Sequence, residues 1–331
     1  MTEEKESGGE STLTVLLAGG VNLAIAIMKL AAGIITGSGA MLSEAAHSVA
    51  DTITEVLLLT ALRRSERPAD RKHPFGYGKE RYFWSLLAAV SIFASGAMFS
   101  FYEGFSTVFG EPEEQTSPIV GYIVLAIAFA LESVSWVQAL RQVRKESAAA
   151  GRSMADYLRT IDDPAPKTVL FEDSAALVGL LLAFAGIGLH QLTGSQVWDG
   201  LASIAIGVLL AVVAYALGRT NRGLLIGRQA DPDIVRGIHR LLSSAPEIEV
   251  VVDLQTMLMG ADQILVCTRV DFDDSLGAAD VERACVRLAG ELETTFNDVT
   301  EVFIEPVPRT DPELRATVLQ RYGDIAARWG Q

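Results

Sequence analysis

The sequence predicts a membrane-embedded bundle of six α-helices followed by a soluble α+β domain. Of the 331 residues, 50% are hydrophobic and the mean hydropathy is +0.30, which is high for a soluble protein of this length. Apolar runs of about 20 residues, long enough to cross about 30 Å of hydrocarbon, end near Leu217, and the rest of the chain is polar. Together these observations separate a membrane part from a soluble part.

The expected membrane spans are apolar runs that contain few charged residues. They are residues 13–36, 40–62, 82–106, 118–140, 168–190 and 196–217. The chain therefore divides into a polar tail at 1–11, a six-span membrane domain at 12–218, a soluble domain at 219–309 and an amphipathic helix at 310–331. The N-terminal stretch has more acidic than basic residues and no small-residue cleavage site, so it does not resemble a secretory signal.

Basic residues are concentrated in the loops on one side of the predicted bundle. Segments 63–81 and 141–167 are rich in Lys and Arg, whereas the opposite loops, TGSG, EGFSTVFGEPEEQTSP and HQLTGSQ, contain neither. Because basic loops stay in the cytoplasm, both termini are expected there. A prokaryotic inner membrane is the simplest location.

The soluble domain is predicted to follow an αββαβ order. Its expected elements are a helix at 232–244, strands at 250–259 and 263–272, a helix at 278–296 and a strand at 299–306. Alternating apolar residues in the strands favour a mainly antiparallel sheet with helices on one face. Residues 221–331 hold 19 Asp and Glu against 11 Arg, which argues against a nucleic-acid partner.

Four ionisable residues interrupt the second span, in the stretch SEAAHSVADTITE. Glu44, His47, Asp51 and Glu55 follow one another at spacings of three, four and four, so they lie along one stripe of a helix. A single polar residue in a span usually packs against another helix. Four on one stripe, each carboxylate costing about 2.5–3.5 kcal/mol at mid-membrane, indicate a binding site or a path.

Other acidic residues lie near this stripe in the predicted bundle. Glu172 and Asp173 are adjacent in the fifth span and point about 100° apart, so one is expected to face the second span while the other turns aside or reaches round. Lys29 and Glu132 are expected to snorkel or to pair between helices. Asp199 lies near a span end, where an interfacial position is expected.

One imidazole combined with several carboxylates predicts a transition-metal site. Such ligands suit Zn²⁺, Mn²⁺, Fe²⁺ or Co²⁺ better than Mg²⁺ or Ca²⁺, which prefer oxygen alone. The ligands must lose protons before they bind a metal, so metal and protons compete for one site. This competition predicts proton-coupled antiport.

Several motifs together resemble the cation diffusion facilitator family of divalent-metal transporters. They are HSVAD in the second span, the loop RPADRKHPFGYGKE after it, an acidic motif early in the fifth span, and the αββαβ domain. The resemblance implies homodimers of six-span protomers that exchange a divalent cation, commonly zinc, for protons by alternating access. It also implies a cytosolic domain of ferredoxin-like or metallochaperone-like fold.

The resemblance assigns metal ligands at three positions of this chain. His47 and Asp51 match the ligands of the second span, and Asp173, expected to face them across a helix pair, matches the acidic ligand of the fifth span. The family's fifth-span histidine would fall at Val169, which cannot coordinate. Glu172 is then the candidate fourth ligand, with water as the competing one.

The outer acids of the stripe, Glu44 and Glu55, are left as the walls of an access path. There, water or pairing with Lys29 would make their charges tolerable.

Some members of the family bind a second metal at the cytosolic loop. The matching positions here are Asp70, His73 and Tyr77, and Tyr77 is a poor zinc ligand. Alternatively, Asp70 and His73 hold the shape of the loop while Gly76 and Gly78 supply its turns.

The soluble domain is expected to mediate dimerisation with little or no metal of its own. His239 is its only histidine, and Cys267 and Cys285 form no CxxC pattern.

The main hypothesis is export of Zn²⁺ from the cytosol in exchange for protons. The alternatives are a preference for Mn²⁺, Fe²⁺ or Co²⁺, a metal sensor or scaffold without transport, and a transporter of organic cations. An enzyme is not expected, and neither is a bound cofactor, because the sequence contains no nucleophile–base arrangement, no Gly-rich phosphate loop and no cofactor motif.

Overall fold

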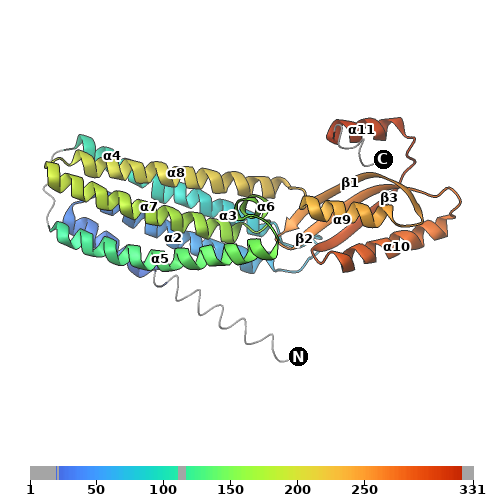
Figure 1. Ribbon diagram of the computed structural model, residues 1–331, viewed down its shortest axis with the longest axis horizontal. Coiled ribbons are helices and arrows are strands. Elements are labelled where there is room, and N and C mark those ends of the chain that lie inside the picture. Colours follow the sequence, from blue (N-terminus) through green and yellow to red (C-terminus); the bar gives the residue numbers. More distant parts are fainter. Residues whose placement is uncertain (1–19, 21, 111–116, 323–331) are drawn as a thin grey trace, which may run out of the picture. The chain divides into compact units, whose positions relative to one another are not determined.

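The computed structural model describes residues 20, 22–110 and 117–322 (Figure 1). These residues form two compact units. The first contains residues 20 and 22–66 together with 80–110 and 117–222, and the second contains Arg67–Lys79 together with residues 223–322. The predicted tail at 1–11, the start of the first span and the last residues of the C-terminal helix lie outside the described residues.

The first unit is built from long apolar helices. Five are long and apolar enough to cross a membrane: α2 (Gly39–Ser65), the run Glu80–Phe109, α5 (Pro118–Ala149), α7 (Pro164–Thr193) and α8 (Val197–Ile226). A shorter apolar helix, Asn22–Thr36, is the described part of the first predicted span. The described residues thus contain five candidate spans, whereas the predicted count of six depends partly on residues before Asn22.

The third crossing is not a uniform α-helix. It consists of α3 (Glu80–Ser91), the π-helical segment η1 (Ile92–Ala97) and α4 (Met98–Phe109). A Cβ atom on Gly96 would lie 2.9 Å from a side-chain carbon of Leu210, so this segment passes close to α8. Apolar periodicity carries no signal for a one-turn π insertion, and the sequence predicted one continuous span here.

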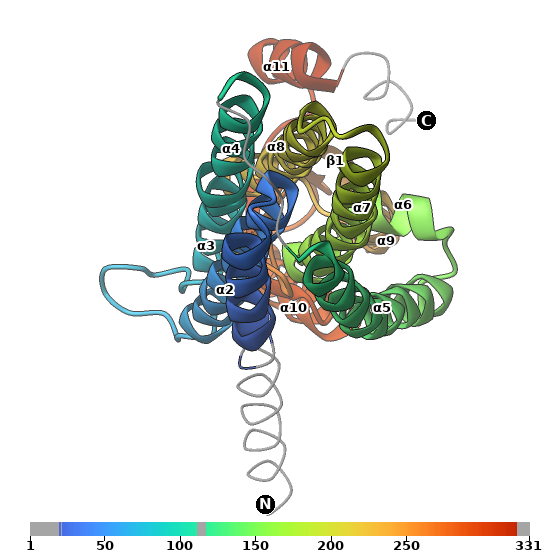
Figure 2. The same ribbon diagram turned by 90° about the vertical axis from the view of Figure 1, so that its left-hand side faces the viewer.

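Helix α2 packs against other helices on two sides. It contacts α3, η1 and α4 on one side and α7 on another, and α5 packs against α7 (Figure 2). Alanines and other small side chains of α2 are fully buried, which lets neighbouring helices approach closely. The polar stripe of α2 is therefore held among other helices.

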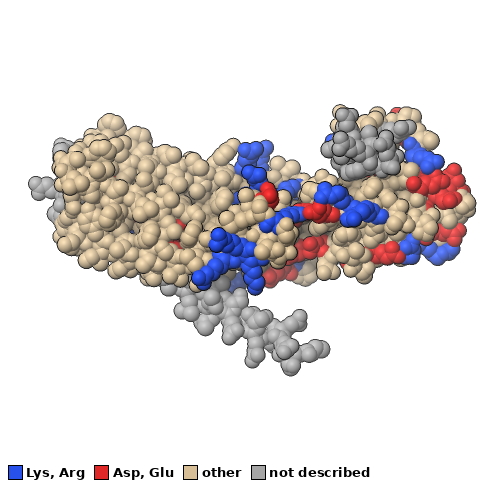
Figure 3. Space-filling model, in the orientation of Figure 1, with Lys and Arg blue, Asp and Glu red and all other residues tan. Residues whose placement is uncertain are grey.

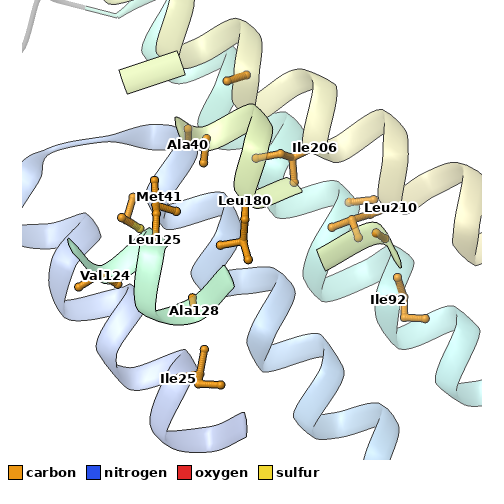
Figure 4. Close-up of a cluster of buried hydrophobic side chains, with 14 of the residues drawn as sticks. Ile25, Ala40, Met41, Ile92, Val124, Leu125, Ala128, Leu180, Ile206 and Leu210 are labelled. Atoms are coloured by element: carbon orange, nitrogen blue, oxygen red, sulfur yellow. The ribbon is translucent and has the colours of Figure 1, made fainter. Parts of the chain in front are cut away.

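Apolar side chains from several helices form the core of the first unit. Met41, Leu125, Leu180, Ile206 and their neighbours pack together there (Figure 4). Large apolar side chains also cover the outside, and the face of the bundle visible in Figure 3 carries almost no charge except at one end. This distribution fits a bundle surrounded by lipid.

The second unit contains a three-stranded sheet and the remaining helices. Its elements are α9 (Pro232–Ser243), β1 (Ile248–Gly260), β2 (Gln263–Phe272), α10 (Ala278–Thr295), β3 (Val299–Pro306) and α11 (Pro312–Tyr322). The helices α9 and α10 bury apolar residues and pack on β1 and β3. The predicted αββαβ order is therefore confirmed.

The sheet order is β1-β2-β3. Strands β1 and β2 are antiparallel, whereas β2 and β3 are parallel. The expectation of a mainly antiparallel sheet is therefore correct for the first pair only. Helix α10 is the crossover connection that brings β3 back in the direction of β2.

Several boundaries differ from the sequence prediction; for example, α5 continues past residue 140 to Ala149. Helix α8 continues past residue 218 to Ile226, because polar residues at a membrane surface need not end a helix. The loop Arg67–Lys79 belongs to the second unit, where the Phe75 ring lies 6.5 Å from the Phe303 ring of β3.

Candidate metal centre

His47 and Asp51 form a buried pair one turn apart on α2. The distance from His47 Nε2 to Asp51 Oδ1 is 3.4 Å, and the His47 side chain is 1% exposed. Both ring nitrogens of His47 and Oδ1 of Asp51 are buried without a hydrogen-bond partner among the described residues. Buried polar atoms normally have partners, so these atoms are the ones that a bound cation would satisfy.

Glu44 lies one turn before His47 and forms an ion pair. Its Oε2 is 3.1 Å from Lys29 Nζ, and both side chains are fully buried. The Lys29 ammonium also donates to Ser48 Oγ at 2.8 Å and lies 3.8 Å from Glu132 Oε1. The expected pairing between helices is confirmed for Lys29 and Glu132, and Lys29 compensates the charge of Glu44.

Glu55 lies one turn beyond Asp51 and has a different partner. Asn22 Nδ2 donates to Glu55 Oε1 at 2.5 Å, whereas Oε2 is buried without a partner. Pairing with Lys29, considered for both outer acids, thus applies to Glu44 and not to Glu55. Whether the two acids line an access path stays a prediction.

The adjacent acids of α7 point to different helices. Glu172 is buried, and its Oε1 has no hydrogen-bond partner among the described residues. Gly179, two turns later and on the same face, packs against Glu44, and a Cβ atom there would lie 3.8 Å from His47 Nδ1. This face of α7 is therefore the one that contacts α2.

Asp173 lies on a different face and accepts a hydrogen bond from Ser135 Oγ of α5 at 2.8 Å. As expected, one of the two acids faces α2 and the other turns to another helix. The acid on the α2 side is Glu172, whereas Asp173, which was expected to face His47 and Asp51, bonds Ser135 of α5. Asp173 remains within electrostatic range of His47, as Glu172 does of Asp51.

The predicted ligands are near one another without enclosing an ion. Across residues 22–110 and 117–322, no group of three or more His, Cys, Asp and Glu side chains converges on one metal position. What the structure provides is one close pair, His47 and Asp51, with the unpartnered carboxylate oxygen of Glu172 on the neighbouring helix. The four-ligand set of His47, Asp51, Asp173 and Glu172 stays a prediction.

Asp199 lies in the first turn of α8 and is buried among other residues, and its interfacial depth in the membrane stays a prediction. The residue is 1% exposed and accepts hydrogen bonds from Ser38 Oγ at 2.7 Å and from Ala40 N at 3.3 Å. Ser38 is the N-cap of α2, and its hydroxyl also accepts from Met41 N. Asp199 on α8 therefore fixes the start of the helix that carries His47 and Asp51.

Asp70 and His73 shape the loop between α2 and α3. Asp70 Oδ1 accepts from the backbone N–H groups of Lys72 and His73, and Oδ2 accepts from the Tyr77 hydroxyl at 2.7 Å. The Tyr77 hydroxyl, followed by the backbone N–H of His73, lowers the pKa of Asp70 to about 2. These contacts are those of a loop-forming carboxylate, and a second metal at Asp70 and His73 stays an untested prediction.

The two glycines of this loop have different roles. Gly76 has a φ of +79°, a conformation that L-residues with a side chain rarely adopt. Gly78 packs directly against the turn between β1 and β2, where a Cβ atom would lie 2.9 Å from Gly260 Cα. Gly76 thus supplies a turn as predicted, while Gly78 permits a close approach.

Sequence reasoning missed the neutral partners of the charged residues. Ser48 bonds Lys29, Ser135 bonds Asp173, and Asn22 bonds Glu55. Ser48 could have been found, because it follows Glu44 by one turn on the polar stripe. The other two belong to different helices, and nothing in their local sequence indicates the pairing.

His239 and the cysteines of the second unit are not gathered at one place. His239 Nδ1 lies 3.4 Å from Ser243 Oγ on the same helix. Burial raises the pKa of the thiols Cys267 and Cys285, and both cysteines are free. These contacts point to packing roles.

Comparison with known proteins identifies the family. Residues 15–226 match the model of the cation efflux transmembrane domain. The chain belongs to the cation diffusion facilitator family. This family consists of membrane transporters and not of enzymes, so the resemblance, the transport class and the exclusion of an enzyme are confirmed.

Individual relatives within the family carry different metals in their names. The proton-coupled zinc antiporter SLC30A9 of Xenopus laevis, a mitochondrial protein, is 36% identical over 80% of this chain and 47% of its own length. The cation-efflux pump FieF of Shewanella oneidensis is 26% identical over 86% of this chain and 90% of its own. The manganese efflux system protein MneP of Bacillus subtilis is 21% identical over 93% and 98%. The chain spans about half the length of the SLC30A9 relatives that it matches.

Proposed function

We propose that this protein is a metal–proton antiporter that exports Zn²⁺ from the cytosol. The observation that supports the proposal most strongly is the buried pair of His47 and Asp51, whose unpartnered nitrogen and oxygen atoms lie inside a bundle of membrane helices. Such atoms are costly in hydrocarbon unless a cation or a proton occupies them. A relative named as a proton-coupled zinc antiporter is consistent with both occupants.

The ligand chemistry favours a borderline transition metal. Imidazole nitrogen combined with carboxylate oxygen suits tetrahedral Zn²⁺, and it also accepts Mn²⁺, Fe²⁺ or Co²⁺. We take Glu172 as the third ligand because its free oxygen is on the helix face that packs on α2. Asp173, which would have to leave Ser135, or a water completes the set.

Proton coupling follows from the same atoms. His47 binds either a proton or a metal at a given ring nitrogen, and a carboxylate that is protonated is a poor ligand. Release of protons on the side where metal enters, and uptake where metal leaves, exchanges the two species by alternating access. No separate proton path is needed beyond the site itself, although Glu44 and Glu55 extend the polar stripe in both directions.

The remaining parts of the proposal concern the assembly and the membrane. We place both termini in the cytoplasm, because the Lys and Arg residues gather in the loops on that side. We also propose a homodimer in a prokaryotic inner membrane. The acidic second unit then lies in the cytosol.

Flux measurements in proteoliposomes test the central claim. With an imposed pH gradient, the wild-type protein is expected to carry Zn²⁺, and Asp51→Ala is expected to reduce the flux at least about tenfold because a metal ligand is lost. Glu172→Gln is expected to act in the same direction. Asp233→Asn, which changes an exposed acid of α9, is the control and should transport like the wild type.

Two results would contradict the proposal. Unchanged Zn²⁺ flux in Asp51→Ala would remove the site assignment. Stoichiometric Zn²⁺ binding by the wild type without any flux would replace the antiporter by a metal sensor or scaffold.

A further inference from the structure

Lys29 places a fully buried positive charge beside the candidate metal centre. Its Nζ lies 3.1 Å from Glu44 Oε2 and 2.8 Å from Ser48 Oγ, both on α2, and 3.8 Å from Glu132 Oε1 on α5. The ammonium does not snorkel, because the side chain has no exposed surface. Burying an ammonium in this way is costly, and the three contacts fix it at one position.

His47 offers a cation two alternative positions. Its Nε2 faces Asp51, with 3.4 Å between Nε2 and Oδ1. Its Nδ1 faces Glu44, with 3.9 Å between Nδ1 and Oε1. Both nitrogens and both of these carboxylate oxygens are buried without hydrogen-bond partners among the described residues, so each side of the ring has the atoms to start a metal shell.

The ammonium makes the two sides unequal. On the Glu44 side, the other carboxylate oxygen already binds Lys29, so the charge of Glu44 is neutralised and a divalent cation there would be repelled at short range. On the other side of the ring, Asp51 has His47 as its ion-pair partner among the described residues, and no ammonium neutralises its charge there. A divalent cation is therefore favoured at Nε2 and Asp51.

We propose that Lys29 is a positioning residue that determines which side of His47 binds the transported cation and thereby the selectivity of the site. Its ammonium takes the place of a metal between Glu44 and Glu132 and keeps both carboxylates out of the metal shell. Glu172 on α7 is then the carboxylate that joins His47 and Asp51. This inference rests on the proposed function, because it assumes that the His47–Asp51 pair binds the metal.

Removing the ammonium should change the chemistry of the centre. Glu44, which lies beside His47 Nδ1, and Glu132 would both lose the cation that they share. A site richer in oxygen suits Mn²⁺ relative to Zn²⁺. Loss of Lys29 is therefore expected to create a second, oxygen-rich position and not only to weaken the first.

Metal titrations of the purified full-length protein in detergent test this. Lys29→Met is expected to bind one more Mn²⁺ per chain than the wild type in calorimetry, and its Mn²⁺ to Zn²⁺ affinity ratio should rise at least about tenfold. The double variant Lys29→Met/Glu44→Gln removes both charges of the Lys29–Glu44 ion pair, so no uncompensated carboxylate remains at position 44. It should lose both the extra Mn²⁺ and the changed ratio.

A second variant decides the question if Lys29→Met does not fold. In Glu44→Gln the amide oxygen still accepts from Lys29, which also keeps Ser48 and Glu132 as partners. Zn²⁺ affinity should change by less than about threefold, since Glu44 is outside the metal shell. A loss of more than about tenfold would show that Glu44 coordinates the metal and would overturn the proposal.

The failure of this inference can be told from the failure of the proposed function. If Lys29→Met folds and binds the same number of Mn²⁺ ions with the same affinity ratio, the role of Lys29 is wrong while the antiporter stands. If Asp51→Ala transports Zn²⁺ like the wild type, the metal site itself is misplaced, whatever the Lys29 variants do.

Discussion

Glu44, Asp199 and Asp70 are carboxylates that face three different kinds of donor. Glu44 faces a buried ammonium, and Asp199 faces the Ala40 N–H group and the N-cap hydroxyl of α2. Asp70 faces two loop N–H groups and the Tyr77 hydroxyl. A donor that is fixed in the fold removes a carboxylate from the set that can bind a metal. Glu44 and Glu55 each keep one unpartnered oxygen, but their other oxygen is held by Lys29 or by Asn22. Asp51 and Glu172 have unpartnered oxygens without such a donor among the described residues, so we expect these two acids to bind the cation.

The loop carboxylate gives a prediction at the residue scale. Because the Tyr77 hydroxyl is the largest cause of the lowered pKa of Asp70, Tyr77→Phe should raise that pKa from about 2 toward the ordinary value of 3.8. Because the pKa of Asp70 is lower in the folded loop than its ordinary value of 3.8, the ionised carboxylate stabilises the loop at pH values above 3.8. That stabilisation is lost as the pH falls toward about 2. In Tyr77→Phe the part that comes from the hydroxyl would be lost, while the N–H groups of His73 and Lys72 would still lower the pKa of Asp70.

NMR titration of ¹³C-labelled Asp side chains in the detergent-solubilised protein measures this pKa. Lys72→Ala is the matched control, because residue 72 contributes only its backbone N–H to Asp70. An unchanged Asp70 pKa in Tyr77→Phe would mean that the hydroxyl does not hold the carboxylate in solution.

Sequence patterns located the charged residues of the site well and their partners poorly. The spacing of Glu44, His47 and Asp51 fixes one face of a helix whatever the tertiary fold, and the structure buries that face. In contrast, the choice between Glu172 and Asp173 depends on how α7 is rotated about its axis. That rotation is set by close packing at positions such as Gly179, which periodicity does not encode.

At the scale of the elements, α2 is held in place by its two ends. Its first turn is capped by Ser38 and by Asp199 of α8, and its last turn carries Arg63 and Arg64, which suit the negative end of a helix dipole. Between these ends lie His47 and Asp51. A fixed start of the helix therefore fixes the height of the ligands in the bundle.

The cap from α8 gives a prediction for stability. Asp199→Asn replaces one carboxylate oxygen with an NH₂ group, which donates hydrogen bonds and accepts none. The variant therefore loses either the bond from Ser38 Oγ or the bond from Ala40 N. We expect the free energy of unfolding to fall by about 1–3 kcal/mol, the usual cost of a lost cap and an unsatisfied buried donor. Denaturation in mixed micelles, followed by tryptophan fluorescence, measures it.

Ser203→Ala is the control on the same helix. The Ser203 hydroxyl donates only to the backbone oxygen of Asp199 one turn earlier, so its removal should cost less than about 1 kcal/mol. Equal effects of the two variants would show that Asp199 does not act through α2.

Elements were predictable from the sequence to different degrees. In the second unit, the strands Gln263–Phe272 and Val299–Pro306 begin and end where alternation predicted them. The parallel pairing of β2 and β3 was not predicted, because alternation reports which face is buried and not which way a neighbouring strand runs. The π segment η1 was missed for a similar reason, since one extra residue per turn leaves an apolar run apolar.

At the scale of the whole molecule, charge separates the two units. The bundle surface in view is nearly uncharged away from one end (Figure 3), whereas the chain from residue 221 onward carries 19 acidic residues. The loop Arg67–Lys79 is basic, yet it belongs to the second unit by its contacts. The basic loop and the acidic unit are therefore expected on the same side of the membrane.

The native cysteines allow that orientation to be tested without adding a label site. Cys267 and Cys285 are the two cysteines of the chain, and both are partly exposed in the second unit. In intact cells a membrane-impermeant maleimide should leave them unlabelled, and permeabilised cells should label both. Labelling should be done above pH 8, because burial raises the pKa of each thiol and the thiolate is the reactive form.

A cysteine placed on the opposite side completes this test. In a variant with Cys267→Ser and Cys285→Ser, Thr193→Cys puts an exposed thiol at the end of α7, beside a loop that contains no Lys or Arg. The positive-inside rule puts this thiol outside the cell, so intact cells should label it. The reverse pattern, with the native cysteines labelled in intact cells and Thr193→Cys protected, would place the second unit outside. Metal would then have to enter the candidate site from the opposite side, and the proposed direction of export would be wrong.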